Sequence, residues 1–281
     1  MSVVNLGLRA VSWVRWRMGA GMSVSPEEFR LHDLPPLVDL HCHLIPGVDD
    51  GAHDEAESLR MMQVALADGI GTIAATPHAH RCPAKRVPEK VARLNEIAQE
   101  NGLNLRIVPG IEVRYDPNLF QRFEAGEFLT LNDTRYMLLE LYLSGSWPKR
   151  LMETIAELHQ AGVWPVLAHA ERYEDVQHDP AILLDVIAAG VPVQLNADSL
   201  AGRPERGARE AAGYLVSNHL AHLIASDGHN ARWRPPMLRA AFERAADLAG
   251  EDYARWMIAN AAAIVAGEPL ELPQPDLVSR L

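Results

Sequence analysis

The sequence predicts an α/β protein in which seven parallel strands close into a barrel. Short apolar runs alternate with stretches of helical periodicity along most of the 281 residues, which is typical of strands joined by crossover helices. Glycines at the ends of most of the helical stretches mark helix C-caps. Seven consecutive strand-helix units favour a closed barrel over an open sheet. A flat doubly wound sheet is the alternative, because closure does not show in a sequence.

The predicted strands are apolar runs of six or seven residues, a length typical of buried parallel strands. In chain order they cover residues 37–42, 71–76, 104–109, 136–142, 163–169, 191–197 and 222–227. The predicted helices cover residues 55–67, 88–100, 149–160, 181–188, 206–218 and 236–248. Five of these helices are followed two residues later by a glycine, at Gly69, Gly102, Gly162, Gly190 and Gly250.

These elements form one domain, which we expect to cover residues 37–268. Residues 1–36 form an extension whose apolar residues are interrupted by Arg9, Arg15 and Arg17, so it lacks the continuous apolar core of a signal peptide. Residues 269–281 are predicted to be a proline-rich tail that cannot continue a helix. No apolar run approaches the roughly 20 residues that a membrane-spanning helix needs.

Composition excludes several classes of partner. The net charge of −11 disfavours nucleic acid and anionic membranes, because both would be repelled. Aromatic residues make up only 6% of the chain, so platforms for stacking bases or sugars are not prominent. Two cysteines in a chain of this length indicate a reducing compartment, and we expect a cytoplasmic protein. The 12 histidines are the unusual feature.

Every predicted strand ends at, or is followed by, a polar side chain. The carboxyl ends of parallel strands meet at one rim, where enzymes of this class hold their sites. These strand-end residues are His41, His43, His78, Glu112, Glu140, His169, Asn196, Asp227 and His229.

The spacing His-x-His at residues 41 and 43 points to metal. Side chains alternate along a strand, so both imidazoles share one face and Cys42 faces the other way. Imidazoles and carboxylates together suit Zn, Mn or Fe(II). So many ionisable groups cannot be buried together without cations or protons. The candidate ligands outnumber the coordination positions of one metal ion, so two or three ions are expected.

Further candidates lie close to the strand ends. One acid of the Asp49-Asp50 pair reaches the same rim, and the other is expected at the start of the helix near Glu55. His80 is either a rim residue or a loop histidine. Six histidines are interpreted as surface or helix residues: His32, His53, His159, His178, His219 and His222.

Two arginines follow the strand ends, Arg172 after His169 and Arg234 after His229, with Arg232 competing for the second position. An arginine beside a metal cluster offers a planar fork for phosphate oxygens. A surface ion pair is the alternative for either arginine.

Seven strings of residues resemble those of the PHP (polymerase and histidinol phosphatase) superfamily between about residues 38 and 267. They are most similar to its capsule-locus manganese-dependent protein-tyrosine phosphatases. The strings are D-L-H-C-H (39–43), V-D-D-G (48–51), A-T-P-H (75–78), G-I-E-V (110–113), L-L-E-L (138–141), L-A-H-A-E-R-Y (167–173) and A-S-D-G-H-N (225–230).

The resemblance implies a distorted seven-stranded barrel of the PHP type with a trinuclear site, filled by Mn²⁺, with Fe or Zn as alternatives. Arg172 and Arg234 would hold the substrate phosphate. The substrate would be a phosphotyrosine protein, such as a tyrosine kinase of polysaccharide or capsule assembly. The implied metal ligands are His41, His43, Asp50, His78, Glu112, Glu140, His169, Asp227 and His229.

The cysteines argue against a thiolate mechanism. A cysteine-dependent tyrosine phosphatase needs an arginine six positions after the cysteine, whereas Cys42 leads to Val48 and Cys82 to Pro88. The expected nucleophile is therefore a metal-bound hydroxide.

Three alternatives stay open. A phosphatase of the histidinol phosphate type would act on a small molecule. A metal-dependent amidohydrolase also opens with His-x-His, but it often uses a carboxylated lysine where this chain has Glu140. A metal-loaded scaffold without activity is disfavoured, because no ligand position is lost.

Overall fold

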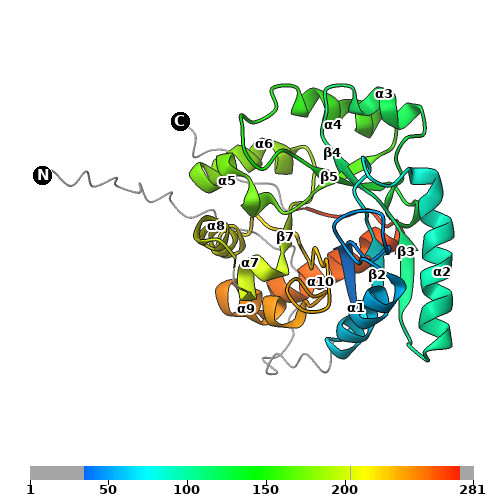
Figure 1. The fold of residues 1–281 in the computed structure, drawn as a ribbon. Helices are drawn as coiled ribbons and strands as arrows, with labels where there is room; N and C mark the ends of the chain where they lie inside the picture. The colour runs from blue at the N-terminus through cyan, green and yellow to red at the C-terminus, as the bar shows by residue number, and fades with distance from the viewer. Residues whose placement is uncertain (1–34, 203, 273–281) are drawn as a thin grey trace, which may run out of the picture.

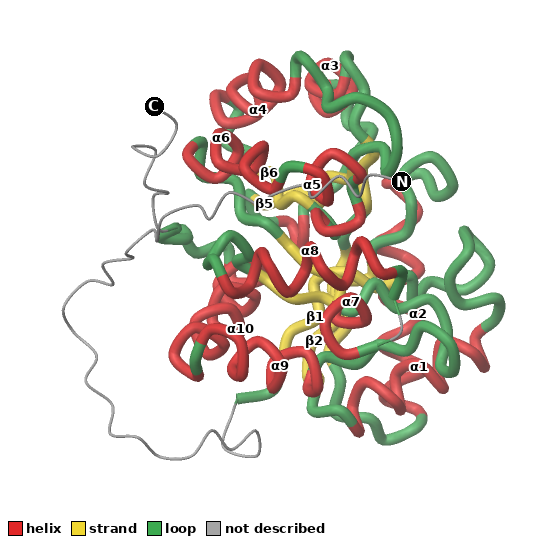
Figure 2. The backbone as a smooth tube through the Cα atoms, turned by 90° about the vertical axis from the view of Figure 1, so that its left-hand side faces the viewer, coloured by secondary structure: helices red, strands yellow, loops and turns green. Residues whose placement is uncertain are grey.

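A computed structural model describes residues 35–202 and 204–272. The predicted α/β class is confirmed. Short parallel strands lie at the centre, with helices around them (Figures 1 and 2). The strands within the described ranges are β1 (Leu37–Cys42), β2 (Ile70–Ala75), β3 (Arg106–Pro109), β4 (Glu112–Arg114), β5 (Tyr136–Glu140), β6 (Trp164–Leu167), β7 (Gln194–Asn196) and β8 (Leu223–Ala225).

Each of the seven predicted strands is present: the first has the predicted bounds, the second is shifted by one residue and the other five are shorter. Strand β4 was not predicted. The break comes at Gly110, where an added Cβ would lie 2.8 Å from Leu131 Cδ2 and 3.0 Å from Thr76 Cγ2. A side chain there would have to displace both groups, and the chain starts a second short strand beyond this glycine. Glu112 therefore begins β4, which pairs in parallel with β5, instead of following β3 as a loop residue.

The strands form three parallel sheets, ordered β1-β2-β3, β4-β5-β6 and β7-β8. Isolated parallel bridges connect them at their edges. They join His78 to Glu112, Leu167 to Val193 and Cys42 to Gly228.

The six predicted helices are present, with ends within three residues of their predicted limits. They are α1 (Glu55–Ala67), α2 (Val87–Glu100), α4 (Leu151–Gln160), α6 (Leu183–Ala188), α8 (Arg206–Ser217) and α9 (Arg239–Ala249). Four further helices were not predicted: α3 (Leu119–Glu124), α5 (Glu174–His178), α7 (Ala197–Ala201) and α10 (Glu251–Ala266). The first three have only five or six residues, too few to show a helical period. Helix α10 buries a single face, but exposed alanines at 259, 262 and 266 on its other side weaken the contrast between the two faces. Along the described parts of the chain, no helix has the length and apolarity to cross a bilayer.

Two buried apolar clusters fix where the site lies. The larger packs the helices against the outside of the strands, and the smaller joins strand residues such as Leu40, Leu138 and Ala225 to Ile264 of α10. Leu138 precedes Glu140 by two positions, and Ala225 precedes Asp227 by two. With side chains alternating along a strand, these acids share the face of the smaller cluster, at the carboxyl ends of the strands.

The interpretation of His222 as a surface or helix residue was wrong. Its side chain is fully buried beside β8, where Nδ1 accepts a hydrogen bond of 3.1 Å from the Val193 amide. Burial lowers the pKa of His222 to about 3, so the ring is neutral. Most of the extension and the tail, residues 1–34 and 273–281, lies outside the described residues.

Candidate metal centre

The structure brings together all nine side chains that the sequence pointed to as ligands. They form four overlapping groups, in each of which the nitrogen and oxygen atoms lie within 4.8 Å of one another. The groups are His43 with Asp50, His78 and His229; His41 with Glu112 and His169; His41 with His43 and Asp227; and His78 with Glu112 and Glu140. We call these nine residues the candidate metal centre.

Glu112 lies in the middle of the centre. Its Oε1 is 3.0 Å from His169 Nε2 and 3.4 Å from His41 Nε2, and its Oε2 is 2.7 Å from His78 Nδ1 and 3.6 Å from His43 Nε2. One carboxylate therefore faces four imidazoles: His41 and His43 at the end of β1, His78 after β2 and His169 after β6.

His41 and His43 meet on one face of β1, as the sequence predicted. Their Nε2 atoms are 3.3 Å apart, and Asp227 Oδ1 lies 3.5 Å from the first and 3.4 Å from the second. Cys42 between them faces the opposite way and lies in the larger apolar cluster. Two ring nitrogens this close, with an acid at equal distance, fit a shared cation with nitrogen and oxygen ligands.

Asp50 closes the exposed side of the centre. Its Oδ1 lies 3.3 Å from His78 Nε2 and its Oδ2 lies 3.5 Å from His229 Nε2, although 64% of the side chain is exposed. The loop that carries Asp50 packs tightly on β1, since an added Cβ at Gly51 would lie 2.1 Å from the carbonyl oxygen of His43. Only glycine permits this approach.

Burial makes the centre electrostatically demanding. His41, His43, Glu112, His169 and Asp227 are each at most 3% exposed. Burial alone would raise the pKa of Asp227, but the charges of His41 and Arg234 and a hydrogen bond to His43 outweigh it and hold the pKa well below its usual range. Asp227 is therefore anionic, which suits a cation site.

Two residues of the centre have left-handed backbone conformations, which side chains other than glycine rarely adopt. The φ angle is 32° at His169 and 51° at Asp227. Neighbouring hydrogen bonds hold both turns: the Asp227 amide donates to the His41 carbonyl at 2.8 Å, and the His169 amide donates to Gln194 Oε1 at 3.3 Å. Backbone strain here aims two side chains into the centre.

Asp49 orients His43, a role that the sequence did not suggest. Its Oδ2 accepts hydrogen bonds from His43 Nδ1 at 2.8 Å and from the His78 amide at 3.0 Å. Although burial raises the pKa of Asp49, the hydrogen bond to His43 lowers it to about 2. The expectation that this acid starts the first helix was wrong, because Asp54 caps α1 and accepts from the Glu57 amide at 2.8 Å. Adjacent acids in a loop cannot be told apart from sequence order.

Gln194 and Asn196 connect His41 to Asp227 through hydrogen bonds. Gln194 Oε1 lies 3.2 Å from His41 Nδ1, and its amide nitrogen donates to Asn196 Oδ1 at 3.0 Å. Asn196 in turn donates to Asp227 Oδ2 at 2.7 Å. The sequence marked Asn196 as a strand end but missed Gln194, which the alternation along β7 places on the same face.

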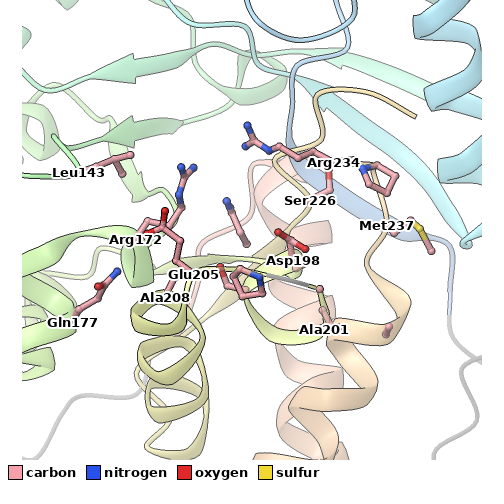
Figure 3. A pocket seen from close by; sticks show the side chains of 18 of the residues that line it. Leu143, Arg172, Gln177, Asp198, Ala201, Glu205, Ala208, Ser226, Arg234 and Met237 are labelled. Carbon is pink, nitrogen blue, oxygen red and sulfur yellow. The ribbon is translucent and has the colours of Figure 1, made fainter. Parts of the chain in front are cut away.

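Arg172 and Arg234 converge on Asp227. Arg172 Nη1 lies 3.2 Å and Arg234 Nη2 lies 2.7 Å from the same oxygen, Oδ2. Both arginines border a pocket of about 550 Å³ that runs on between α7, α8 and α9 (Figure 3). Arg232 does not compete for this place, because its guanidinium stacks on the exposed Trp233 ring, 4.9 Å from the ring centroid.

His80 lies on the exposed edge. Its ring is 5.1 Å from that of His78, and its Nε2 accepts a hydrogen bond of 3.3 Å from Arg81. It belongs to none of the four ligand groups.

Comparison with known proteins agrees with the resemblance seen in the sequence. Residues 37–266 match the family model for capsular polysaccharide synthesis, CpsB/CapC. The tyrosine-protein phosphatase YwqE of Bacillus subtilis is 34% identical over 202 residues, which cover 70% of this chain and 79% of the relative. The tyrosine-protein phosphatase CpsB of Streptococcus pneumoniae is 29% identical over 216 residues, covering 74% and 88%.

Solved structures agree as well. The crystal structures of YwqE and CpsB, described as metal-dependent tyrosine phosphatases, supply a match with a TM-score of 0.80 and 30% identity, covering 85% of this chain and 99% of the other. A lactonase from Listeria monocytogenes shares the fold alone, with a TM-score of 0.55 and 15% identity over 84% of this chain and 95% of the lactonase. The predicted family is confirmed: this chain belongs to the CpsB/CapC family of capsular polysaccharide synthesis.

Proposed function

We propose that this protein is a metal-dependent phosphatase that hydrolyses phosphotyrosine in proteins. The observation that carries the proposal is Asp227, whose Oδ1 faces His41 and His43 while its Oδ2 holds Arg172 and Arg234 at the edge of a pocket. Ligands for cations and two guanidinium groups therefore meet at one carboxylate. The two named phosphatase relatives support the same activity.

The nine residues of the candidate metal centre are the proposed ligands of two or three ions. Mn²⁺ is the first choice, and Fe or Zn suit the same nitrogen and oxygen donors. When bound, such ions supply a water of lowered pKa as nucleophile and neutralise charge on the phosphoryl group. Asp49 and Gln194 keep His43 and His41 in place by hydrogen bonds to Nδ1, which leaves Nε2 directed into the centre.

Arg172 and Arg234 are proposed to bind the phosphate of the substrate. Their guanidinium groups now share one oxygen of Asp227, and a phosphate in the pocket mouth would offer them further oxygens. Two positive charges at this point stabilise the charge that builds up on the transferring group. The phenolate of tyrosine, with a pKa near 10, needs less protonation on leaving than an alkoxide does.

The proposed catalytic domain is a distorted seven-stranded barrel of the PHP type spanning residues 37–268. Following the pairings and the isolated bridges, the order β1, β2, β4, β5, β6, β7, β8 returns to β1, with β3 and β4 as two halves of one position. We further propose a cytoplasmic protein whose substrate is a tyrosine kinase of capsule or exopolysaccharide assembly.

The test compares substrates and metals on the purified full chain. We expect a phosphotyrosine peptide to be hydrolysed faster than histidinol phosphate, with Mn²⁺ giving the highest rate among Mn²⁺, Fe²⁺ and Zn²⁺. Arg172→Met is the control for adventitious hydrolysis and should lose most of the activity. Faster turnover of histidinol phosphate would replace the proposal with a small-molecule phosphatase.

A further inference from the structure

Arg114 and Glu140 form an ion pair inside the candidate metal centre. The two residues lie directly opposite each other in the parallel pairing of β4 and β5. Arg114 Nε donates to Glu140 Oε2 at 2.8 Å, and the guanidinium also lies 5.8 Å from the ring centroid of Tyr142. The Glu140 side chain is 8% exposed, so water screens this pair only in part.

The pair leaves Glu140 with one oxygen for a cation. With Oε2 held by Arg114, the remaining Oε1 faces the centre, 3.9 Å from His169 Nε2. Glu140 belongs to a single ligand group, with His78 and Glu112. A carboxylate that shares its charge with a guanidinium is a weaker ligand than a free one, since the fixed positive charge also repels the ion.

Arg114 differs from the arginines on Asp227 in how it is anchored. Arg172 and Arg234 come from segments outside the strands and border the pocket, so a phosphate can draw them away from Asp227. Arg114 comes from a strand whose register fixes it beside Glu140, and it does not border that pocket. Its contact with Glu140 therefore persists whatever binds in the pocket.

We infer that Arg114 is a positioning residue that holds Glu140 as a one-oxygen ligand and thereby lowers the cation affinity of the group of His78, Glu112 and Glu140. The inference rests on the proposed metal centre and adds to it a residue that tunes one of its ligand groups.

The experiment measures binding of Mn²⁺ to the metal-free full chain by calorimetry and by competition with a chelator, with elemental analysis for stoichiometry. Arg114→Met is expected to lower the Kd of one ion about tenfold and to leave the Kd of the other ions within twofold. Arg114→Lys keeps the positive charge and should stay close to the wild type. Arg150→Met, which removes an arginine from an exposed pair with Glu153, is the matched control and should change nothing.

Each outcome decides the matter. The same set of Kd values in wild type and Arg114→Met, or weaker binding in the variant, would overturn the role of Arg114 while leaving the phosphatase proposal intact. Absence of Mn²⁺, Fe²⁺ and Zn²⁺ binding in the wild type would overturn both. Should Arg114→Met fail to fold, Arg114→Gln, which is neutral and keeps a donor, carries the same expectation.

Discussion

On one side of the candidate metal centre, Asp227 shares an oxygen with Arg172 and Arg234, which come from segments outside the strands. On the other side, Glu140 shares an oxygen with Arg114, which comes from the neighbouring strand. The same chemical pair thus has two different consequences. Arginines that border a pocket are available to a substrate, whereas an arginine fixed by strand register can act only on the carboxylate beside it.

The largest expected effect separates the two carboxylates. Asp227→Asn should lower kcat/KM on a phosphotyrosine peptide by roughly 10³-fold, because it weakens both the cation site at His41 and His43 and the seat of the two arginines. Glu140→Gln should cost only about 10- to 100-fold, since it weakens one ligand group and leaves the two arginines at the pocket in place. Assays with saturating Mn²⁺ measure the difference, and equal losses would remove the distinction between the two sides.

The next effect concerns the arginines themselves. Arg172→Met and Arg234→Met should each reduce kcat/KM by about 10²-fold through loss of charge stabilisation on the phosphoryl group. Arg232→Met is the matched control from the same segment as Arg234 and should stay within about twofold, because its guanidinium stacks on Trp233 instead of facing Asp227. A loss in Arg232→Met as large as that in Arg234→Met would contradict the assignment.

A smaller effect is expected at Asp49, a carboxylate whose partner is a histidine instead of an arginine. Asp49→Asn should weaken Mn²⁺ binding by about tenfold, because a neutral amide replaces the anionic acceptor that orients the ring of His43. Titration of the metal-free protein with Mn²⁺ gives the Kd. Asp54→Asn, a change at the exposed cap of α1, serves as control, and unchanged binding in Asp49→Asn would contradict the orienting role.

The last effect lies outside the centre and concerns stability instead of catalysis or metal binding, at the buried His222. Because the pKa of folded His222 is about 3 and that of an unfolded histidine is about 6.5, the unfolded chain takes up a proton first as the pH falls. Stability is therefore complete above pH 6.5 and declines below it, by about 2 kcal/mol at pH 5 from this group. His222→Gln should remove that part of the decline. Urea unfolding of the metal-free wild type and His222→Gln between pH 7 and pH 5 measures the decline in stability. An equal decline in both proteins would contradict this role of His222.

The sequence predicted much of the centre because strand ends in an α/β fold converge. All nine candidate ligands follow that rule or lie in the loop beside it, and the structure places them together. Contacts that depend on strand register or on the path of a loop could not be predicted from the sequence. The pairing of Arg114 with Glu140 depends on β4, which is hidden by the break at Gly110, and the choice between Asp49 and Asp50 depends on how a loop folds over His43. Gln194 was missed because a single buried amide gives no pattern.

The left-handed backbone at His169 and Asp227 limits how stable this protein can become while it keeps its site. Each such residue costs of order 1 kcal/mol relative to a glycine. A search for heat-tolerant variants without a screen for activity would therefore favour glycine at both positions and discard the two side chains that the fold strains to present. Substitutions that raise thermal stability at these two positions would therefore remove the site. Stabilising substitutions that keep the site have to be made elsewhere, such as in the outer helices.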